Sequence, residues 1–288
     1  MRTPTITVVV CSKNNERTIR SCVESILAQD YPVHQILAVD GLSKDGTVRI
    51  LEEYGSVKVL SDNGEGLAHA RNIGWRNATG EFVAYVDADS EIPSSWLHKM
   101  MEEAKRNEQL AGVQDTPVSI SLSKNLTSLL DIYFFTVSTY RASRSKDNGA
   151  GGIENSLWRR KALQEVSGFD ETYKKYFEDL DLITRIQTAG WKTLRAPSIT
   201  HKHFVRQNAR DSFLQYYWRG YFARIYDERA GKRRSIQREV TRFLPSALMH
   251  SFLAFKITRE VKSLLVFFIV IQKRFAFLYG YFGGANGE

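Results

Sequence analysis

The first 120 residues alternate short apolar runs with amphipathic segments, and this alternation restricts the fold more than any other feature of the chain. The apolar runs at 6–10, 35–40, 57–62 and 81–87 have the length of buried strands, and each precedes a segment with helical spacing. Strands that alternate with helices predict a mostly parallel sheet with helices on both faces.

Polar residues follow each of the four apolar runs, at Cys11–Asn14, Asp40–Gly41, Ser61–Asn63 and Asp87–Asp89. In such sheets, ligands bind beyond the carboxyl ends of the strands. Carboxylates such as those of Asp87 and Asp89 suit Mg²⁺ or Mn²⁺ held jointly with substrate phosphates. An Asp-x-Asp sequence is also common as a solvated strand end, so the surrounding motifs must decide between the two interpretations.

Beyond residue 120 the pattern is less regular. It predicts a helix over 126–140, a second helix over 178–189, and short strands in "WKTLRAP" and "SITHKHF". The polar, Gly-rich segment 141–152 predicts a loop, which either closes over a neighbouring cleft or is a passive surface loop.

The basic character of the chain lies in its C-terminal third. From His201 onward there are 16 Lys and Arg against 6 Asp and Glu, whereas the first 200 residues carry 24 and 26. Such an excess favours an anionic partner. Aromatic and basic residues alternate with apolar ones over 206–288, as in helices that lie in a membrane interface. The alternative is that these helices pack on the rest of the protein or in a dimer interface.

Neither a disulfide framework nor a membrane-spanning segment is expected. Cys11 and Cys22 favour a reduced protein, and the first residues lack a signal-peptide pattern. The longest apolar run, Leu264–Ile271, is too short to cross a bilayer. We therefore expect a cytoplasmic protein, attached peripherally to the cytoplasmic face of a membrane.

Six ordered segments then place the acidic strand end in context. They are "VVVCSKNNERTIRSCVESILAQDYP", "AVDGLSKDGT", "GEGLAHARNIG", "ATGEFVAYVDAD", "NSLWRRKALQEVSGFDE" and "EDLDLITRIQTAG". Together they resemble the family 2 glycosyltransferases. The resemblance implies an α/β, GT-A fold: a Rossmann-like, mixed and mostly parallel sheet flanked by helices. It implies a catalytic domain at 1–205, with a nucleotide-binding half at 1–115 and an acceptor half at 116–205. The helical, basic and aromatic region 206–288 lies outside the resemblance.

The resemblance also implies roles for residues that match the family pattern. Asp40 would contact the nucleotide base, Arg71 the base or the phosphates, and Asp87 the ribose. Ser12 and Asn14 would add polar contacts to the donor. In place of the aromatic residue that commonly stacks on the base, this chain has Lys13.

The remaining roles concern the metal and the acceptor. Asp89 would bind Mn²⁺ or Mg²⁺, and His201 stands near the position of a histidine that completes the metal site. A locally hydrogen-bonded strand histidine is the alternative for both His201 and His203. Asp179 would be the general base, with Glu178 orienting it or the acceptor. Near the loop, Glu154 and Asn155 could face the acceptor.

The implied reaction is an inverting transfer of a sugar from a nucleoside-diphosphate sugar, with UDP or GDP as the favoured nucleotide. The acceptor would be lipid-linked or a glycan, with an anionic membrane surface as partner; a homodimer stays open, and nucleic acid is not expected. The alternatives are a nucleotidyltransferase and a non-catalytic nucleotide-sugar-binding protein. A nucleotidyltransferase normally has a Gly-rich loop after its first strand, and "VVVCSKNNERT" has no glycine.

Overall fold

The computed structural model describes residues 2–145 and 149–283. The chain divides into two compact units, which we describe separately. The sheet unit comprises Met1–Val118 with Lys146–His203, and the helical unit comprises Ser119–Ser145 with Phe204–Glu288.

The strands and helices of the sheet unit follow the predicted alternation. In chain order they are β1 (Ile6–Ser12), α1 (Ile19–Leu27), β2 (Val33–Asp40), α2 (Thr47–Glu52), β3 (Val57–Ser61), α3 (Leu67–Asn77), β4 (Phe82–Tyr85), β5 (Ser90–Glu91), α4 (Trp96–Lys105), β6 (Leu110–Ile120), β7 (Ser156–Arg159), α6 (Arg160–Glu165), α7 (Glu178–Thr188) and β8 (Lys192–Phe204).

The described strands form one mixed sheet in the order β3-β2-β1-β4-β7-β6-β8-β5. Strand β1 pairs in parallel with β2 and β4, and β2 pairs in parallel with β3. Strand β7 is antiparallel to both β4 and β6. Because β1, β2 and β4 run in the same direction, their carboxyl ends bring Ser12, Asp40 and the residues after Tyr85 to one edge.

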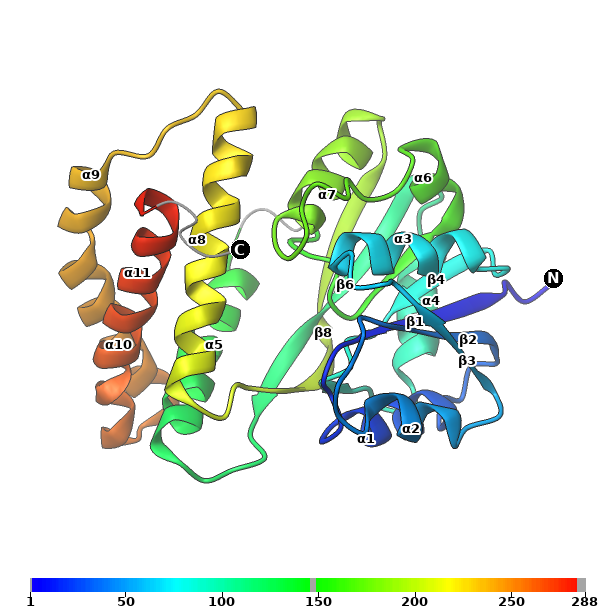
Figure 1. Ribbon diagram of the computed structural model, residues 1–288, viewed down its shortest axis with the longest axis horizontal. Helices are drawn as coiled ribbons and strands as arrows, with labels where there is room; N and C mark the ends of the chain where they lie inside the picture. The colour runs from blue at the N-terminus through cyan, green and yellow to red at the C-terminus, as the bar shows by residue number, and fades with distance from the viewer. Residues whose placement is uncertain (1, 146–148, 284–288) are drawn as a thin grey trace. The chain divides into compact units, whose positions relative to one another are not determined.

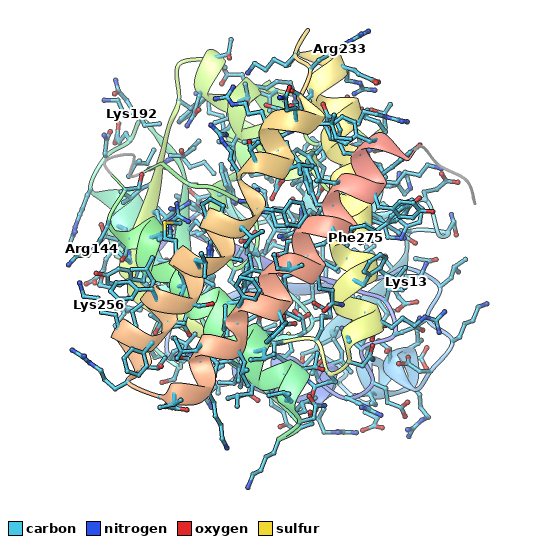
Figure 2. All side chains as sticks on the ribbon, turned by 90° about the vertical axis from the view of Figure 1, so that its left-hand side faces the viewer. Lys13, Arg144, Lys192, Arg233, Lys256 and Phe275 are labelled. Carbon is cyan, nitrogen blue, oxygen red and sulfur yellow. The ribbon has the colours of Figure 1, made fainter. Side chains whose placement is uncertain are left out.

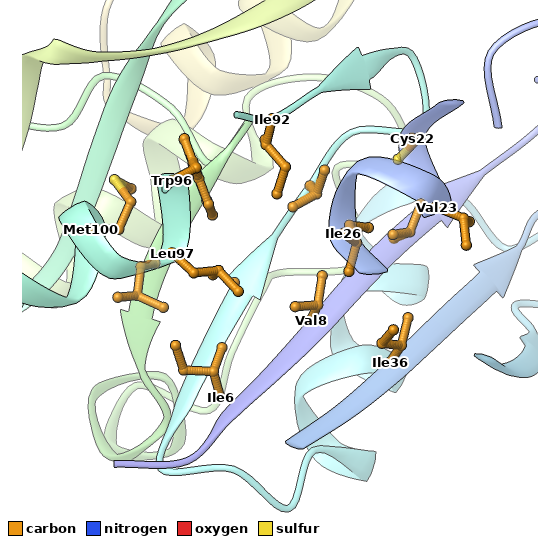
Figure 3. Packing of buried hydrophobic residues seen from close by; sticks show 14 of the residues in the cluster. Ile6, Val8, Cys22, Val23, Ile26, Ile36, Ile92, Trp96, Leu97 and Met100 are labelled. Carbon is orange, nitrogen blue, oxygen red and sulfur yellow. The ribbon is translucent and has the colours of Figure 1, made fainter. Parts of the chain in front are cut away.

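Apolar clusters cover both faces of the sheet. Ile6, Val8 and Val10 of β1 contribute to one cluster with α1, α2 and α4, whereas Val9 contributes to the other with α3, α6 and α7. This division follows from the two-residue period of a strand. Figure 1 shows α1 and α2 on one side of the parallel strands and α3 on the other, and Figure 3 shows the first cluster closely.

Three features of the sheet unit differ from the prediction. Strands β6 and β7 were not predicted, and "WKTLRAP" and "SITHKHF" form one strand, β8, that continues through Pro197. The first three residues of the predicted loop 141–152 are the last turn of α5 (Leu126–Ser143). Residues 146–148 of that loop lie outside the described part of the chain.

The helical unit is built on α5. Its other elements are α8 (Ala209–Arg229), α9 (Ile236–Thr241), α10 (Phe243–Thr258), the 3₁₀-helix η1 (Val261–Leu265) and α11 (Val266–Phe282). Helices α8 and α11 lie side by side in Figures 1 and 2 and cross at Gly220 and Gly280. A Cβ on either glycine would lie 1.9 Å from a backbone oxygen of the other helix, so only glycine permits this approach.

Helix α5 belongs with the C-terminal helices and not with the acceptor half in which the sequence analysis placed it. Its buried Leu130 and Val137 share an apolar cluster with Ala254 of α10 and Ile269 of α11. Within the described residues, no helix combines the length and the apolarity that crossing a bilayer requires.

Candidate active site

Asp40 is buried among hydrogen-bond donors at the end of β2. Its side chain is 5% exposed and accepts hydrogen bonds from Ser12 Oγ (3.1 Å), Ser43 N (2.8 Å) and Ser43 Oγ (2.6 Å). These donors hold the carboxylate in a single orientation and stabilise its charge in a buried position.

Asn14 connects the two loops that border Asp40. It adopts a left-handed conformation, with φ of 55°, which asparagine tolerates better than most residues. Its Oδ1 accepts from Lys44 N (2.8 Å), and its own N–H donates to Ser43 Oγ (2.8 Å). Ser12 and Asn14, both expected to contact the donor, therefore also shape the surroundings of Asp40.

The Asp-x-Asp segment follows β4 at the same edge of the sheet. Asp87 is half-buried, and burial together with the charge of Asp89 raises the pKa of its carboxyl, while Arg71 opposes that shift. One oxygen of Asp89 lies 3.6 Å from His203 Nδ1. The two aspartates therefore have different surroundings: Asp87 is influenced by Arg71, and Asp89 is paired with a histidine from β8.

His201 has a different environment from His203, although both lie on β8. His201 is 2% exposed, with Nδ1 2.7 Å from Asp115 Oδ2 and Nε2 3.0 Å from Asn155 Nδ2. Both ring nitrogens thus have partners within the protein, so this geometry does not present His201 as a metal ligand. It differs from the expectation, because His203 is the histidine that lies beside Asp89.

Asn155 also differs from its expected role. Its side chain is fully buried, and its amide nitrogen lies 3.0 Å from Ser90 Oγ as well as from His201. Trp96 Nε1 donates to Asp115 at 2.6 Å and extends this buried network. Asn155 is therefore placed to hold strands together and not to face an acceptor.

Helix α7 begins with the two acids that the sequence analysis singled out. Glu178 is 3% exposed, and one of its oxygens accepts from Arg71 at 2.6 Å. The other oxygen is buried without a hydrogen-bond partner. Burial raises the pKa of Glu178 to about 8, although Arg71 lowers it. Asp179 is half-buried in the first turn of the same helix.

Glu154 joins the same group of acids. Burial and the charges of Asp179 and Asp87 raise the pKa of Glu154 to about 7. Asp179 therefore lies close enough to influence both Glu154 and Glu178. Carboxyl groups whose pKa values are raised by burial and by neighbouring charges are typical of sites that move protons.

The residues that could hold a metal are few. Over 2–145 and 149–283, His, Cys, Asp and Glu side chains form no group of three or more that is placed to bind a metal ion. Asp89 and His203 nevertheless offer an oxygen and a nitrogen donor, and a metal that is shared with substrate phosphates needs only one or two protein ligands. The two donors suit a divalent ion such as Mn²⁺ or Mg²⁺ whose remaining ligands are not side chains of this kind.

Sequence reasoning missed Ser43, Asp115 and the pairing of His203. The alternation in "THKH" places His201 and His203 on the same face of a strand but does not predict how far each side chain is buried. Asp62, in the polar segment after β3, forms a turn, because its carboxylate accepts hydrogen bonds from Gly64 N (2.7 Å) and Gly66 N (3.3 Å).

Comparison with known families decides which class of protein this site belongs to. The family described as "Glycosyl transferase family 2" matches residues 7–167, more than half of the chain. The chain belongs to glycosyl transferase family 2. The predicted family and the prediction of a transferase enzyme are thereby confirmed.

Curated relatives of this family 2 chain are named for different reactions. The poly-β-1,6-N-acetyl-D-glucosamine synthase of Staphylococcus epidermidis is 26% identical over 194 residues, which is 65% of this chain and 45% of the relative. The glucosyl-dolichyl phosphate glucuronosyltransferase of Haloferax volcanii is 22% identical over 244 residues, 77% of each chain. For several relatives, the synthase included, this chain spans about a third to a half of their length.

Solved structures agree on the fold. A mannosyltransferase from Pyrobaculum calidifontis, solved with GDP-Man and Mn²⁺, has a TM-score of 0.63 at 18% identity and covers 96% of this chain and 88% of its own. Residues 1–349 of S. aureus TarS have a TM-score of 0.53 at 14% identity, with 96% and 90% coverage. The predicted GT-A fold, a mixed α/β sheet with flanking helices followed by a helical region, is confirmed.

Proposed function

We propose that this family 2 chain transfers a sugar from a nucleoside-diphosphate sugar to an acceptor hydroxyl, with inversion at the sugar carbon and with Mn²⁺ or Mg²⁺ as cofactor. The observation that carries the proposal is the arrangement at one sheet edge. This edge holds the buried Asp40 and the Asp89–His203 pair. It also holds Asp179, whose charge raises the pKa of Glu154.

The donor would bind along the carboxyl ends of β1, β2 and β4. Asp40 would accept from the nucleotide base, and Asp87 would accept from the ribose hydroxyls. Asp89 and His203 would hold the divalent ion, which supplies positive charge that stabilises the departing diphosphate. UDP and GDP are the favoured nucleotides, since the two solved relatives bind GDP-Man in one case and UDP in the other.

Asp179 would act as the general base. Its carboxylate takes the proton of the acceptor hydroxyl while that oxygen bonds to the sugar carbon, and the bond to the diphosphate breaks with its electron pair leaving on the diphosphate. Both Arg71 and burial hold Glu178 in place, whereas Asp179 is half-buried in the first turn of the helix, so we assign the role of base to Asp179. Glu154 would orient the acceptor hydroxyl.

The acceptor class follows from less direct support. The Haloferax relative is named for a dolichyl phosphate acceptor, and the Staphylococcus relative is named for a polysaccharide product. We therefore retain a lipid-linked molecule or a glycan as the acceptor, and we place the protein peripherally at the cytoplasmic face of a membrane. Neither the proposed acceptor nor the proposed membrane location requires a homodimer.

Donor hydrolysis tests the proposal. The purified full chain is incubated with a panel of UDP- and GDP-sugars, with and without Mn²⁺, and the released nucleoside diphosphate is measured. We expect one donor to be hydrolysed in the presence of the metal. Asp89→Asn should abolish this release, whereas Glu91→Gln, two residues away and paired with the exposed Lys202, should not.

The same assay separates the alternatives. Absence of release from every donor, together with donor binding that Asp89→Asn leaves unchanged, would overturn the proposal in favour of a non-catalytic binder. Release of pyrophosphate from a nucleoside triphosphate and a sugar phosphate would indicate a nucleotidyltransferase.

A further inference from the structure

Helix α10 exposes a continuous line of large apolar side chains. Leu244, Leu248 and Phe252 are 59%, 58% and 63% exposed. Residues four apart lie above one another on a helix, so these three form a single stripe. The next residue on that line is the exposed Lys256. An isolated exposed leucine needs no explanation, but a stripe of this kind indicates an interaction surface.

The stripe continues into the turn between α10 and α11. Val261 and Leu264 of η1 are 72% and 44% exposed, and Phe268 at the start of α11 is 64% exposed. Lys256, Arg259 and Lys262 are also exposed in this segment. We call residues 244–268 the apolar hairpin. Figure 2 shows α10 and α11 side by side, with Lys256 labelled near the hairpin end of α10.

Within 230–282, all of which the structure describes, each acid has a partner in the protein, so the charge of the apolar hairpin is positive. Between residues 229 and 282 the only acids are Glu239 and Glu260. Glu239 lies 3.6 Å from Arg274 and 3.9 Å from Arg234, and Glu260 accepts a hydrogen bond from the Tyr133 hydroxyl. The cations of the hairpin are therefore available to an external anion.

The exposed apolar stripe and its positive charge distinguish between two partners, a second copy of the chain and an anionic bilayer. A second copy of the chain would bring the same positive charges against this surface, which opposes association. An anionic bilayer satisfies both requirements, because phenylalanine and leucine side chains enter the acyl boundary while lysine and arginine remain at the phosphates.

We propose that the apolar hairpin docks the protein on an anionic lipid bilayer. Phe252 and Phe268 enter the interface between headgroups and acyl chains, and Lys256, Arg259 and Lys262 bind lipid phosphates. This inference deepens the proposed function, because it names the surface that would hold the protein where a lipid-linked acceptor lies. It rests on the proposed function only for the identity of that acceptor.

Vesicle co-sedimentation of the full chain tests this surface. The vesicles contain either phosphatidylcholine alone or phosphatidylcholine with phosphatidylglycerol. We expect stronger binding to the anionic vesicles. Replacing Lys256, Arg259 and Lys262 by Gln should weaken that binding roughly a hundredfold. Phe252→Ser with Phe268→Ser should weaken binding by about tenfold or more on both vesicle types.

Matched controls lie in the sheet unit. Replacing Lys99, Lys105 and Arg106 by Gln removes the same net charge from exposed positions of α4 and the residue after it, and should leave binding within about threefold of the native chain, because the removed charges lie outside the hairpin. Leu27→Ser, at an exposed residue of α1, is the apolar control.

The proposal is overturned if the native chain binds neither vesicle, or if both hairpin variants bind like the native chain. It is also overturned if the phenylalanine variant changes the oligomeric state and not vesicle binding, since a second copy would then cover the hairpin. Donor hydrolysis without vesicles is measured in parallel on every variant. A variant that loses vesicle binding but still hydrolyses the donor shows that the two properties are separate. Failure of this inference can then be distinguished from failure of the proposed function.

Discussion

The sheet unit and the helical unit each bury an ion pair, but they differ in what surrounds it. The sheet unit buries apolar side chains on both faces and places Asp40, Asp87 and Glu178 at one edge. The helical unit buries an ion pair, in which Lys273 Nζ lies 2.7 Å from Asp131 Oδ1, and exposes residues such as Phe252.

The two buried ion pairs differ in their surroundings. In the sheet unit, Arg71 pairs with Glu178 at 2.6 Å and also feels the charges of Asp87 and Asp179. In the helical unit, Lys273 is paired with Asp131 and lies 4.3–4.7 Å from the centres of the Phe134, Phe135 and Tyr216 rings. Charge at the sheet edge should therefore govern activity, whereas charge inside the helical unit should govern stability.

The largest expected effect is on catalysis. Asp179→Asn removes the proposed base and should lower kcat about 10³-fold, with little change in the thermal midpoint because the side chain is only half-buried. Steady-state transfer and thermal unfolding measure the two quantities. A variant that loses stability as much as activity would assign Asp179 a structural role and would break the contrast between the units.

A comparably large effect, on stability, is expected in the helical unit. Lys273→Met leaves Asp131 buried without its partner and should lower the free energy of unfolding by about 3–5 kcal/mol. The double variant Lys273→Met with Asp131→Leu should recover most of that loss, because it removes both charges. Denaturant unfolding measures both. The control is Lys262→Met at an exposed position, which should change stability by about 0.5 kcal/mol or less.

The two histidines of β8 provide a comparison within the sheet unit. His203→Ala should raise the Mn²⁺ concentration for half-maximal donor hydrolysis by ~10–100-fold, because it removes the partner of Asp89. His201→Ala should leave that concentration nearly unchanged but lower the thermal midpoint, because Asp115 loses its buried partner. The reverse pattern would restore His201 as the metal ligand.

The smallest effect concerns the pH dependence of stability. The pKa of Glu154 rises from 4.5 to about 7 in the folded protein, so the folded state retains a proton that the unfolded state releases. Stability therefore falls as the pH rises through this range. Glu154→Gln should match the native chain at pH 4.5 and exceed it by about 1–2 kcal/mol at pH 8, as measured by denaturant unfolding. An equal difference at both pH values would contradict this origin.

Sequence patterns predicted most of the sheet unit because its first half is organised by local periodicity. The strands β1 to β4 and the helix α7 were found close to their observed bounds, since alternating apolar runs identify such elements. Strands β6 and β7 escaped prediction because neither "LAGVQDTPVSI" nor "SLWR" is an uninterrupted apolar run of the length that identified β1 to β4. Their residues carry no turn signal that marks them as a hairpin.

The sequence by itself determined the family, the grouping of acids at one sheet edge, and Asp179 at the start of a helix. These follow from short-range spacing and from the rule that parallel strands present their carboxyl ends together. Only the tertiary structure decided that His203 approaches Asp89 while His201 is buried on Asp115, that Asn155 is internal, and that α5 joins the C-terminal helices. The physical reason is that burial depth and partner identity depend on side chains far apart in the chain, and spacing along one strand or helix does not specify them.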